Sequence, residues 1–388
     1  MKFFHLSDLH IGKQLNHYNL KEDQAYILNQ VVEKAYELRP DAIVIAGDIY
    51  DKSIPSAEAV TIFDDFLTKI SEIKPEIPVF IIAGNHDSAE RLDFANSILA
   101  KHNVYISGLP PRDKDEFLKK VTLNDEFGQV DFYLLPFIKP GYVRHIFEDG
   151  EITSYDDAVI KIIERENIDY SKRNVLVAHQ FFTYKDIKPE TCDSEVSLIS
   201  VGGLDNVDVS AVKDFDYVAL GHIHGPQKIG YDHIRYAGSL LKYSVSERNH
   251  NKALLVVELQ NKADGIKIEQ LKLDTLRDLR LEEGLLEDIL SRATKDNKDD
   301  YVSIILKDEI DQYKPKEQLE GVYSHILEIR VDNARTRSRL ELADEEIIID
   351  NPITAFEKFF FEMQNREMTE DERKAIVEIV SNIKENVI

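Results

Sequence analysis

The sequence predicts an α/β fold, and three observations support this. Over about the first 270 residues, short apolar runs alternate with longer amphipathic stretches, as strands and helices do in layered α/β domains. The runs are rich in Val, Ile and Leu and are bounded by Gly, Asp, Asn or Pro, which is typical of buried strands. The chain has 388 residues, of which 43% are hydrophobic and 31% charged, so it is large enough to bury a substantial core.

Seven of the apolar runs are expected to be strands. They are Phe3–Ser7, Ala42–Ala46, Val79–Ala83, Asp131–Leu135, Val175–Ala178, Tyr217–Leu220 and Leu254–Leu259. Between the early strands, apolar residues at helical spacing predict helices over Lys21–Leu38, Ala57–Ile70 and Arg91–Lys101. This alternation indicates helices layered on a sheet.

The sequence changes character past Asp274. Leu281–Arg292 is expected to be a helix, and Tyr301–Leu306 and Ile326–Val331 are expected to be strands. Together they predict a small α+β module. At roughly 150 residues per domain, the length of the chain is consistent with two or three domains.

We therefore divide the chain into residues 1–270, 271–334 and 335–388. The last part is acidic, with 13 acidic and 5 basic residues over Leu340–Ile388. A Phe-rich helix is expected over Ile353–Met363, followed by a charged helix with an apolar stripe over Ala375–Ile383. Two interpretations stay open here, a helix pair that docks on a partner and a pair that packs on its own domain.

Clusters of Asp, Asn and His follow the apolar runs. The five clusters are Asp8-x-His10, Gly47-Asp48-x-x-Asp51, Gly84-Asn85-His86-Asp87, His179 and Gly221-His222-x-His224. In open α/β sheets, ligand sites form beyond the carboxyl ends of the strands, so we expect these side chains to converge. An extended backbone over Asp8-x-His10 would point both side chains to one side.

These residue types suit a metal site. Imidazole with carboxylate and amide oxygen favours Mn, Fe or Zn over thiolate-seeking metals. A carboxylate such as Asp48 can bridge two cations, and two ions roughly 3.5–4 Å apart can clamp a phosphate and activate a water. Each cluster alone has an ordinary interpretation, such as a loop cap or a turn. Their shared placement favours the metal site.

The series of clusters resembles the calcineurin-like metallophosphoesterase superfamily, whose pattern is D-x-H, G-D-x-x-D, G-N-H-D/E, a lone His and G-H-x-H. All five elements are present without substitution. In closer detail the chain is similar to the SbcD-type nuclease subunits. The stretches that carry this resemblance are LSDLHIGKQL, AGDIYDKSIPS, IAGNHDSAERLDFAN, YVALGHIHGPQ and AGSLLKYSVSE. It covers residues 1–260 strongly and the tail only by architecture.

The resemblance implies an αββα sandwich with a small α+β capping domain and a C-terminal helical tail. It implies one metal held by Asp8, His10, Asp48 and His224, and a second held by Asp48, Asn85, His179 and His222. The metals would be two Mn²⁺ ions, with Mg²⁺, Fe or Zn as alternatives. His86 would protonate the leaving 3′ oxygen as a general acid, and Asp51 would hydrogen-bond to His86 and keep it protonated, unless Asp51 is only a turn cap.

Three further residues are candidates for contact with nucleic acid. Lys13 and Arg91 follow two of the metal motifs, and His17 could line the same cleft. A solvated surface role is at least as good an interpretation for Lys13 and Arg91, and it is the better one for His17. The single cysteine, Cys192, is expected to be an inert thiol because no His/Asn arrangement makes it a nucleophile.

The resemblance also implies partners. The chain has no G-x-x-x-x-G-K-[S/T] motif, so it should not hydrolyse ATP itself. SbcD-type subunits act with an SbcC-type ATPase, which the C-terminal helices would bind. They also form homodimers, here expected through the helices near residues 57–70 and 91–101.

The expected function is a two-metal DNA nuclease subunit in DNA repair, recombination and replication, with 3′→5′ exonuclease activity on duplex ends and endonuclease activity on single strands and hairpins. The alternatives are a phosphatase or cyclic-nucleotide phosphodiesterase, and a non-catalytic scaffold. The net charge of −24 disfavours nonspecific binding to nucleic acid, so we expect the subunit alone to hold DNA weakly. One cysteine and the lack of a roughly 20-residue apolar stretch predict a cytoplasmic protein without a membrane segment.

Overall fold

The computed structural model describes residues 1–185, 187–195, 206–310, 312–337, 352–364, 366–370, 372–374 and 376. The chain divides into two compact units. The larger holds Met1–Leu281, Ala293–Ser303 and Glu320–Glu328, and the second holds Glu282–Arg292, Ile304–Leu319 and the described residues from Ile329 onward. The domain boundaries expected at residues 270 and 334 stay predictions.

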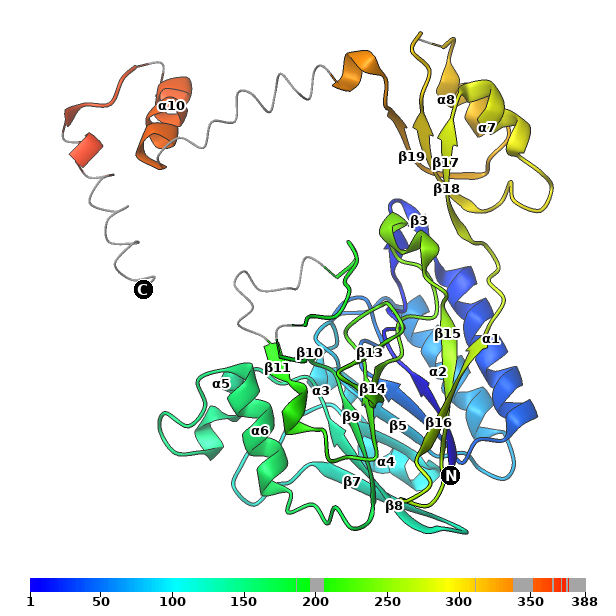
Figure 1. The fold of residues 1–388 in the computed structure, drawn as a ribbon, viewed down its shortest axis with the longest axis vertical. Coiled ribbons are helices and arrows are strands. Elements are labelled where there is room, and N and C mark those ends of the chain that lie inside the picture. Colours follow the sequence, from blue (N-terminus) through cyan, green and yellow to red (C-terminus); the bar gives the residue numbers. More distant parts are fainter. Residues whose placement is uncertain are drawn as a thin grey trace. The chain divides into compact units, whose positions relative to one another are not determined.

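Two six-stranded sheets form the centre of the larger unit (Figure 1). The first has the order β16 (Ile266–Lys272), β15 (Ala253–Leu259), β1 (Lys2–Leu6), β4 (Ala42–Ala46), β5 (Val79–Ile82) and β6 (Val104–Ser107). The second has the order β13 (Gln227–Ile229), β14 (Tyr231–Tyr236), β12 (Tyr217–Leu220), β9 (Arg173–Ala178), β8 (Gly128–Leu135) and β7 (Lys119–Asp125). Each sheet has four parallel strands, β1, β4, β5 and β6 in the first and β8, β9, β12 and β14 in the second.

Helices cover the outer face of each sheet (Figure 1). Helices α1 (Lys21–Leu38) and α2 (Ala57–Ser71) share a core with the first sheet, and α6 (Tyr155–Arg165) shares one with the second. A third core lies between the sheets, where the Phe132 ring packs 5.5 Å from that of Phe3 and 4.8 Å from that of Phe80, measured between centroids. The expected αββα sandwich is therefore confirmed.

Local sequence explains where two of these helices begin. Ser56 caps α2, because its hydroxyl accepts a hydrogen bond from the backbone N–H of Ala59 at 3.2 Å. Helix α6 begins with a capping box, in which the Ser154 hydroxyl and the Asp157 carboxylate each accept the other residue's backbone N–H at 3.0 Å. Each such cap stabilises a helix by about 1 kcal/mol.

The larger unit also contains shorter elements. They are β2 (Gln14–Leu15), β3 (Tyr18–Asn19), α3 (Ala89–Leu92), α4 (Asn96–Leu99), α5 (Pro140–Val143), β10 (Phe181–Thr183), β11 (Asn206–Asp208) and 3₁₀ turns at Ala100–His102, Arg144–Ile146, Val209–Ala211 and Val245–Asn249.

Two expected helices are wrong. The helix expected over Arg91–Lys101 is broken into α3, α4 and a 3₁₀ turn, because Ala95 has a left-handed backbone with φ 59° and the Asn96 amide bonds to Asp93 and to the carbonyl of Ile106. The first half of Leu281–Arg292 is strand β17 (Leu279–Gly284), and only Leu286–Arg292 forms a helix, α7. Strand β17 forms because it pairs with strands distant in sequence, and the helical spacing of apolar residues does not reveal such pairing.

Strand β17 belongs to a three-stranded sheet with β18 (Tyr301–Leu306) and β19 (His325–Val331), and α8 (Pro315–Glu320) lies between the latter two in sequence. The expected Phe-rich helix is α10 (Pro352–Gln364). The helix expected to follow lies outside the described residues apart from a few positions near Thr369 and at Ile376.

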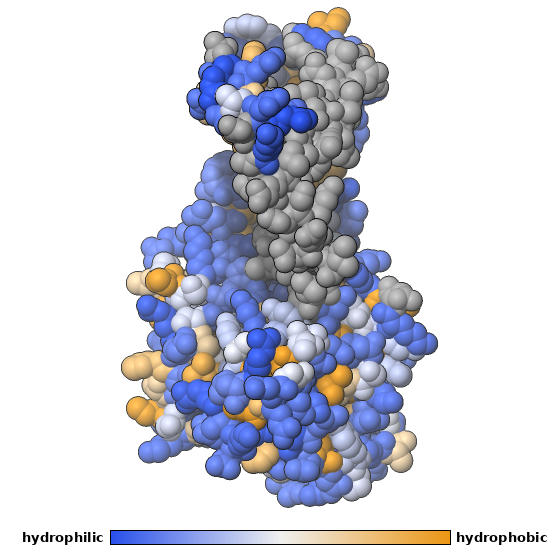
Figure 2. Space-filling model, turned by 90° about the vertical axis from the view of Figure 1, so that its left-hand side faces the viewer, coloured by the Kyte–Doolittle hydropathy of each residue, from blue (hydrophilic) through white to orange (hydrophobic). Residues whose placement is uncertain are grey.

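The surface drawn in Figure 2 is mainly hydrophilic where it is described, with hydrophobic side chains in small groups. In the described part of the chain, no helix combines the length and the apolar character that a membrane crossing needs.

Candidate metal centre

Five loops bring the polar clusters together at one edge of the two sheets. Strands β1, β4 and β5 are parallel neighbours in the first sheet, and β9 and β12 are parallel neighbours in the second. Their carboxyl ends lead directly into the five clusters. The structure therefore brings together all seven expected ligands, which are Asp8, His10, Asp48, Asn85, His179, His222 and His224.

The first group consists of Asp8, His10, Asp48 and His224. The Nε2 atoms of His10 and His224 lie 3.0 Å apart, and His10 Nε2 lies 3.6 Å from Asp48 Oδ2. Ligand atoms of Asp8, His10 and His224 all fall within 4.8 Å of one another. Two imidazole nitrogens that face each other beside a carboxylate are arranged as two ligands of one cation would be.

The second group shares Asp48 with the first. His179 Nε2 lies 3.3 Å from Asp48 Oδ2 and 3.0 Å from Asn85 Oδ1, and His222 Nδ1 lies 2.8 Å from Asn85 Oδ1. The same oxygen of Asp48 thus faces both groups. The donors are nitrogen and oxygen atoms, which fit a hard or borderline divalent ion, and the shared carboxylate fits a pair of ions.

The tautomer of His179 is set by the backbone. Its Nδ1 lies 2.7 Å from the carbonyl oxygen of Ala46, which can only accept, so Nδ1 carries the proton and donates it. Nε2 is then the ring atom that faces Asp48 and Asn85, and in the neutral ring its lone pair can bind a cation there. Metal-binding histidines are commonly fixed in this way.

The backbone over Asp8-x-His10 is not extended, so that expectation is wrong. Asp8 and His10 have φ values of 51° and 42°, and Asp48 has a φ of 50°, all in the left-handed region that L-residues rarely adopt. Backbone hydrogen bonds hold this conformation, from Asp8 N to Gly47 O at 3.1 Å and from His10 N to Asp48 O at 2.9 Å. The loops after β1 and β4 therefore fix each other, and strain of this kind is typical of functional sites.

Two glycines of the motifs are required by close approach. A Cβ at Gly84 would collide with the carboxylate and backbone nitrogen of Asp48, and a Cβ at Gly221 would collide with the carbonyl oxygen of Ala46. Any larger residue at either position would move a ligand or the carbonyl that orients His179.

Asp87 has a role that the sequence did not reveal. Its carboxylate accepts backbone hydrogen bonds from Ile49 at 3.1 Å, Tyr50 at 3.0 Å and Gly84 at 2.9 Å, and so ties the loop after β4 to the loop after β5. Burial and the nearby Asp48 raise the pKa of Asp87 to about 6. Its position as the last residue of Gly-Asn-His-Asp was the available signal.

His86 lies beside the first group. Its backbone N–H donates to Asp48 Oδ1 at 2.9 Å, and its ring packs edge-on against the His10 ring with centroids 4.8 Å apart. Its Nδ1 donates to the backbone carbonyl of Asp51 at 2.9 Å. The expected bond between the two residues thus uses the Asp51 carbonyl, while the Asp51 carboxylate accepts from Lys13 Nζ at 2.8 Å.

Burial and mutual charge shift the pKa values within the centre. Burial raises the pKa of Asp8 to about 6, against the opposing effect of His179. Burial alone would lower the pKa of His179, but the carboxylate of Asp48 raises it to about 9. Since a histidine binds metal as a neutral ring, a cation must displace the proton that His179 would otherwise hold.

Two family models match the chain. The calcineurin-like phosphoesterase model matches residues 1–226, and the model described as "Type 5 capsule protein repressor C-terminal domain" matches residues 275–365. The SbcD subunit of the SbcCD nuclease from Staphylococcus epidermidis is 34% identical over 90% of this chain and 92% of its own, and that of Staphylococcus saprophyticus is 32% identical over 99% of both chains. The chain belongs to the SbcD family of calcineurin-like phosphoesterases.

This assignment to the SbcD family depends on sequence. Among solved structures, a dimetal phosphatase from Danio rerio covers 71% of this chain and 98% of its own, at 12% identity and a TM-score of 0.39. As a member of the SbcD family, the chain is a metal-dependent phosphodiesterase of the metallophosphoesterase fold. The family implies divalent metal ions, and the described ligand groups could hold them.

The three residues expected to contact nucleic acid differ in their surroundings. The Lys13 side chain is only 15% exposed and is paired with Asp51, so the structure gives it a partner within the chain. His17 is exposed with its ring 4.1 Å from that of Tyr18, and Arg91 is exposed on α3. Their contact with nucleic acid stays a prediction for this SbcD-family chain.

Proposed function

We propose that this chain is the nuclease subunit of an SbcCD-type complex and cleaves DNA phosphodiester bonds with two divalent ions, Mn²⁺ in the first place. The main support is that all seven expected ligands and His86 converge from five loops. The chain also aligns with an SbcD relative over 99% of its length. The proposed activity is that of a 3′→5′ exonuclease on duplex ends and an endonuclease on single strands and hairpins.

The chain's own residues support this chemistry. Bound divalent ions would polarise the phosphate and lower the pKa of an attacking water. Asp48 couples the two ligand groups, since one of its oxygens faces both. His86 has its Nδ1 bonded to the Asp51 carbonyl, so its Nε2 is the ring atom that can donate a proton to the leaving oxygen.

A hydrolysis assay tests this proposal. Blunt duplex, hairpin and single-stranded DNA would be incubated with Mn²⁺, with and without an SbcC-type ATPase, beside a phosphopeptide and a cyclic nucleotide. We expect cleavage of DNA, stimulated by the ATPase. Faster hydrolysis of the phosphopeptide or the cyclic nucleotide would favour the phosphatase or phosphodiesterase alternative, and no hydrolysis of any substrate would favour the scaffold.

We further propose that α10 docks on the ATPase partner. Its side chains Phe356, Phe359, Phe361 and Met363 are between 37% and 66% exposed, which is unusual for an apolar set on one helix. An exposed apolar helix face fits a groove on another protein.

A homodimer is proposed through the region of α2, α3 and α4. Val60, Phe94 and Ile98 are 44%, 80% and 63% exposed there. Light scattering of the wild-type chain and of Phe94→Asp would test this, with a dimer expected for the first and a monomer for the second. We also propose a cytoplasmic setting and roles in DNA repair, recombination and replication, which the resemblance to SbcD-type subunits implies.

A further inference from the structure

The stretch Ala237–Glu247 contains none of the expected ligands, yet it surrounds one of them. The backbone N–H of Ser239 donates to the carbonyl oxygen of His224 at 3.2 Å, and Lys252 Nζ donates to the same oxygen at 2.7 Å. The Tyr243 ring packs edge-on against the rings of His10 and His224, with centroids 5.6 Å and 5.7 Å apart. This stretch therefore encloses the loop that carries His224.

Glu247 accepts hydrogen bonds from several residues of this region. Its side chain is fully buried and pairs with Lys252 Nζ at 2.5 Å, and the Lys252 side chain is only 5% exposed. The other carboxylate oxygen accepts from the hydroxyls of Ser194 at 2.7 Å and Ser244 at 3.0 Å. A buried carboxylate that is paired with an ammonium is ionised and can only accept hydrogen bonds.

The direction of the next hydrogen bond follows from this. Ser194 has one hydroxyl proton, and that proton is committed to Glu247. Ser194 Oγ also lies 2.7 Å from His224 Nδ1, so it must be the acceptor there and His224 Nδ1 must carry the proton. The Cys192 thiol, 3.1 Å away, can donate to the remaining lone pair of Ser194 Oγ.

The consequence appears at the other nitrogen of the ring. With Nδ1 protonated, His224 Nε2 has a free lone pair, and this atom faces His10 Nε2 at 3.0 Å. We propose that Lys252, Glu247 and Ser194 form a positioning chain that fixes the tautomer and orientation of His224 for binding a divalent metal ion. This inference rests on the proposed metal centre and adds three residues that do not touch the metal.

The tautomers of His179 and His224 are set in different ways. At His179 the backbone carbonyl of Ala46 sets the tautomer directly. His224 Nδ1 bonds instead to Ser194, which lies 30 positions before it in sequence. Ser194 is in turn bonded to Glu247, which lies 53 positions after Ser194. Disruption of the positioning chain should therefore weaken binding of the ion held by His10 and His224 more than binding of the ion held by His179.

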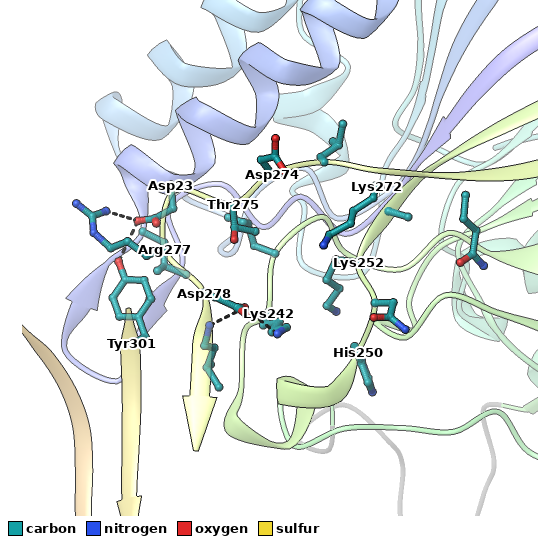
Figure 3. Close-up of a pocket in the computed structure, with 17 residues that line it drawn as sticks. Asp23, Lys242, His250, Lys252, Lys272, Asp274, Thr275, Arg277, Asp278 and Tyr301 are labelled. Carbon is teal, nitrogen blue, oxygen red and sulfur yellow. Dashed lines mark hydrogen bonds and ion pairs between the residues drawn. The ribbon is translucent and has the colours of Figure 1, made fainter. Parts of the chain in front are cut away.

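Lys252, the end of the positioning chain far from His224, borders a cavity. Lys252 lines a pocket of about 440 Å³ together with Lys272 and His250 (Figure 3). Lys252 also donates to Ser239 Oγ at 2.8 Å. Lys252 is thus linked to the His224 ring through Glu247 and Ser194, and to the His224 backbone by its direct hydrogen bond to the carbonyl oxygen.

The test compares Ser194→Ala and Glu247→Gln with Ser244→Ala in the full chain. Ser244 donates to the same carboxylate oxygen as Ser194 but does not bond to His224, so it is the matched control. Mn²⁺ affinity and stoichiometry would be measured by calorimetry and by EPR of free Mn²⁺. Two-bond ¹H–¹⁵N NMR spectra of the histidine-labelled, metal-free chain would report the tautomer of His224 independently of metal and activity.

For Ser194→Ala and Glu247→Gln we expect a loss of roughly 10- to 100-fold in affinity for one of two Mn²⁺ ions, the range found for residues that orient metal-binding histidines. The NMR spectrum should show Nδ1–H for His224 in the wild type and in Ser244→Ala, and a mixture of tautomers in the other two variants. Circular dichroism would verify that each variant is folded, and Ser194→Cys, which keeps a weak donor and acceptor, should restore part of the affinity.

Wild-type affinity for both ions together with an unchanged tautomer in Ser194→Ala would overturn the positioning chain, as would an equal loss in Ser244→Ala. These results differ from a failure of the proposed function. If the wild-type chain bound no Mn²⁺ at all, the metal centre itself would be wrong, whichever tautomer His224 had.

Discussion

The metal centre and helix α10 differ in how their side chains are held. The side chains of Asp8, His10 and His179 are at most 1% exposed, and each is fixed by atoms of loops distant in sequence. In α10, Phe359 is 56% and Met363 66% exposed. The chain itself thus specifies the geometry of its metal centre, whereas the exposed apolar side chains of α10 are proposed to be covered by a partner protein. Substitutions in one region should therefore leave the role of the other intact.

The largest effect is expected from Asp48→Asn. Because one oxygen of Asp48 faces both ligand groups, the loss of its charge should remove both ions and reduce Mn²⁺-dependent DNA cleavage below detection. Cleavage and Mn²⁺ stoichiometry would be measured together. Asp131→Asn changes another buried carboxylate and is the control, with both quantities expected unchanged. Two bound ions and measurable cleavage in Asp48→Asn would contradict the bridging role.

His86→Asn should separate chemistry from metal binding. Loss of a general acid typically reduces the rate by about 10²–10⁴-fold. The His86 ring lies close to His10 and Asp48, but we propose that it is not a ligand, so Mn²⁺ affinity should stay near that of the wild type. Single-turnover cleavage and a Mn²⁺ titration measure the two effects. Unimpaired cleavage in His86→Asn would exclude the proposed acid.

The double variant Phe359→Glu with Met363→Glu should weaken only binding to the partner. These residues lie four apart, on one face of α10, and the loss of an interface hot spot of about 2 kcal/mol corresponds to roughly 30-fold weaker binding. Binding to the SbcC-type ATPase would be measured by interferometry, with Gln364→Ala as a control on the same helix. The isolated subunit should cleave DNA at the wild-type rate, and a loss of that activity would contradict the division between the two regions.

Much of the fold could be predicted because it is encoded locally. Ala42–Ala46, Tyr217–Leu220 and Tyr301–Leu306 were placed to the residue. The first two are continuous apolar runs, and the third is apolar except for Ser303. The break at Ala95 could not be predicted, because it depends on side-chain bonds of Asn96. The strand over Leu279–Gly284 could not be predicted either, because it depends on a sheet formed with strands far along the chain.

The candidate site shows the same limit. The motifs indicated which side chains converge, because ligand residues follow the ends of parallel strands. They did not indicate the left-handed backbone at Asp8 and His10, which loop-to-loop hydrogen bonds impose. Ser194 was not singled out, and Glu247 was quoted only as part of AGSLLKYSVSE, because no motif links either residue to His224. Only the folded chain places them in one line of hydrogen bonds.

The smallest effect is expected far from both regions, at Asp125. Burial alone would raise the pKa of this carboxylate, but hydrogen bonds from Arg173 and from the Met1 ammonium hold the pKa well below its usual value. A carboxylate whose folded pKa is depressed stabilises the fold above its unfolded pKa of about 3.8, and this contribution is lost as the pH falls through the lower, folded pKa.

Asp125→Asn should therefore lower the free energy of unfolding by about 1.5–3 kcal/mol at neutral pH, the range for hydrogen bonds to charged groups. The difference from the wild type should shrink below about pH 4, where the wild-type carboxylate begins to lose its advantage. Urea unfolding between about pH 2.5 and pH 7 measures this, with the exposed Asp264→Asn as control. Mn²⁺ affinity at neutral pH should be unchanged, because the pair with Arg173 stabilises the sheets without touching any loop of the metal centre. A difference in stability that stayed constant across this pH range would show that the Asp125 charge is not what stabilises the fold.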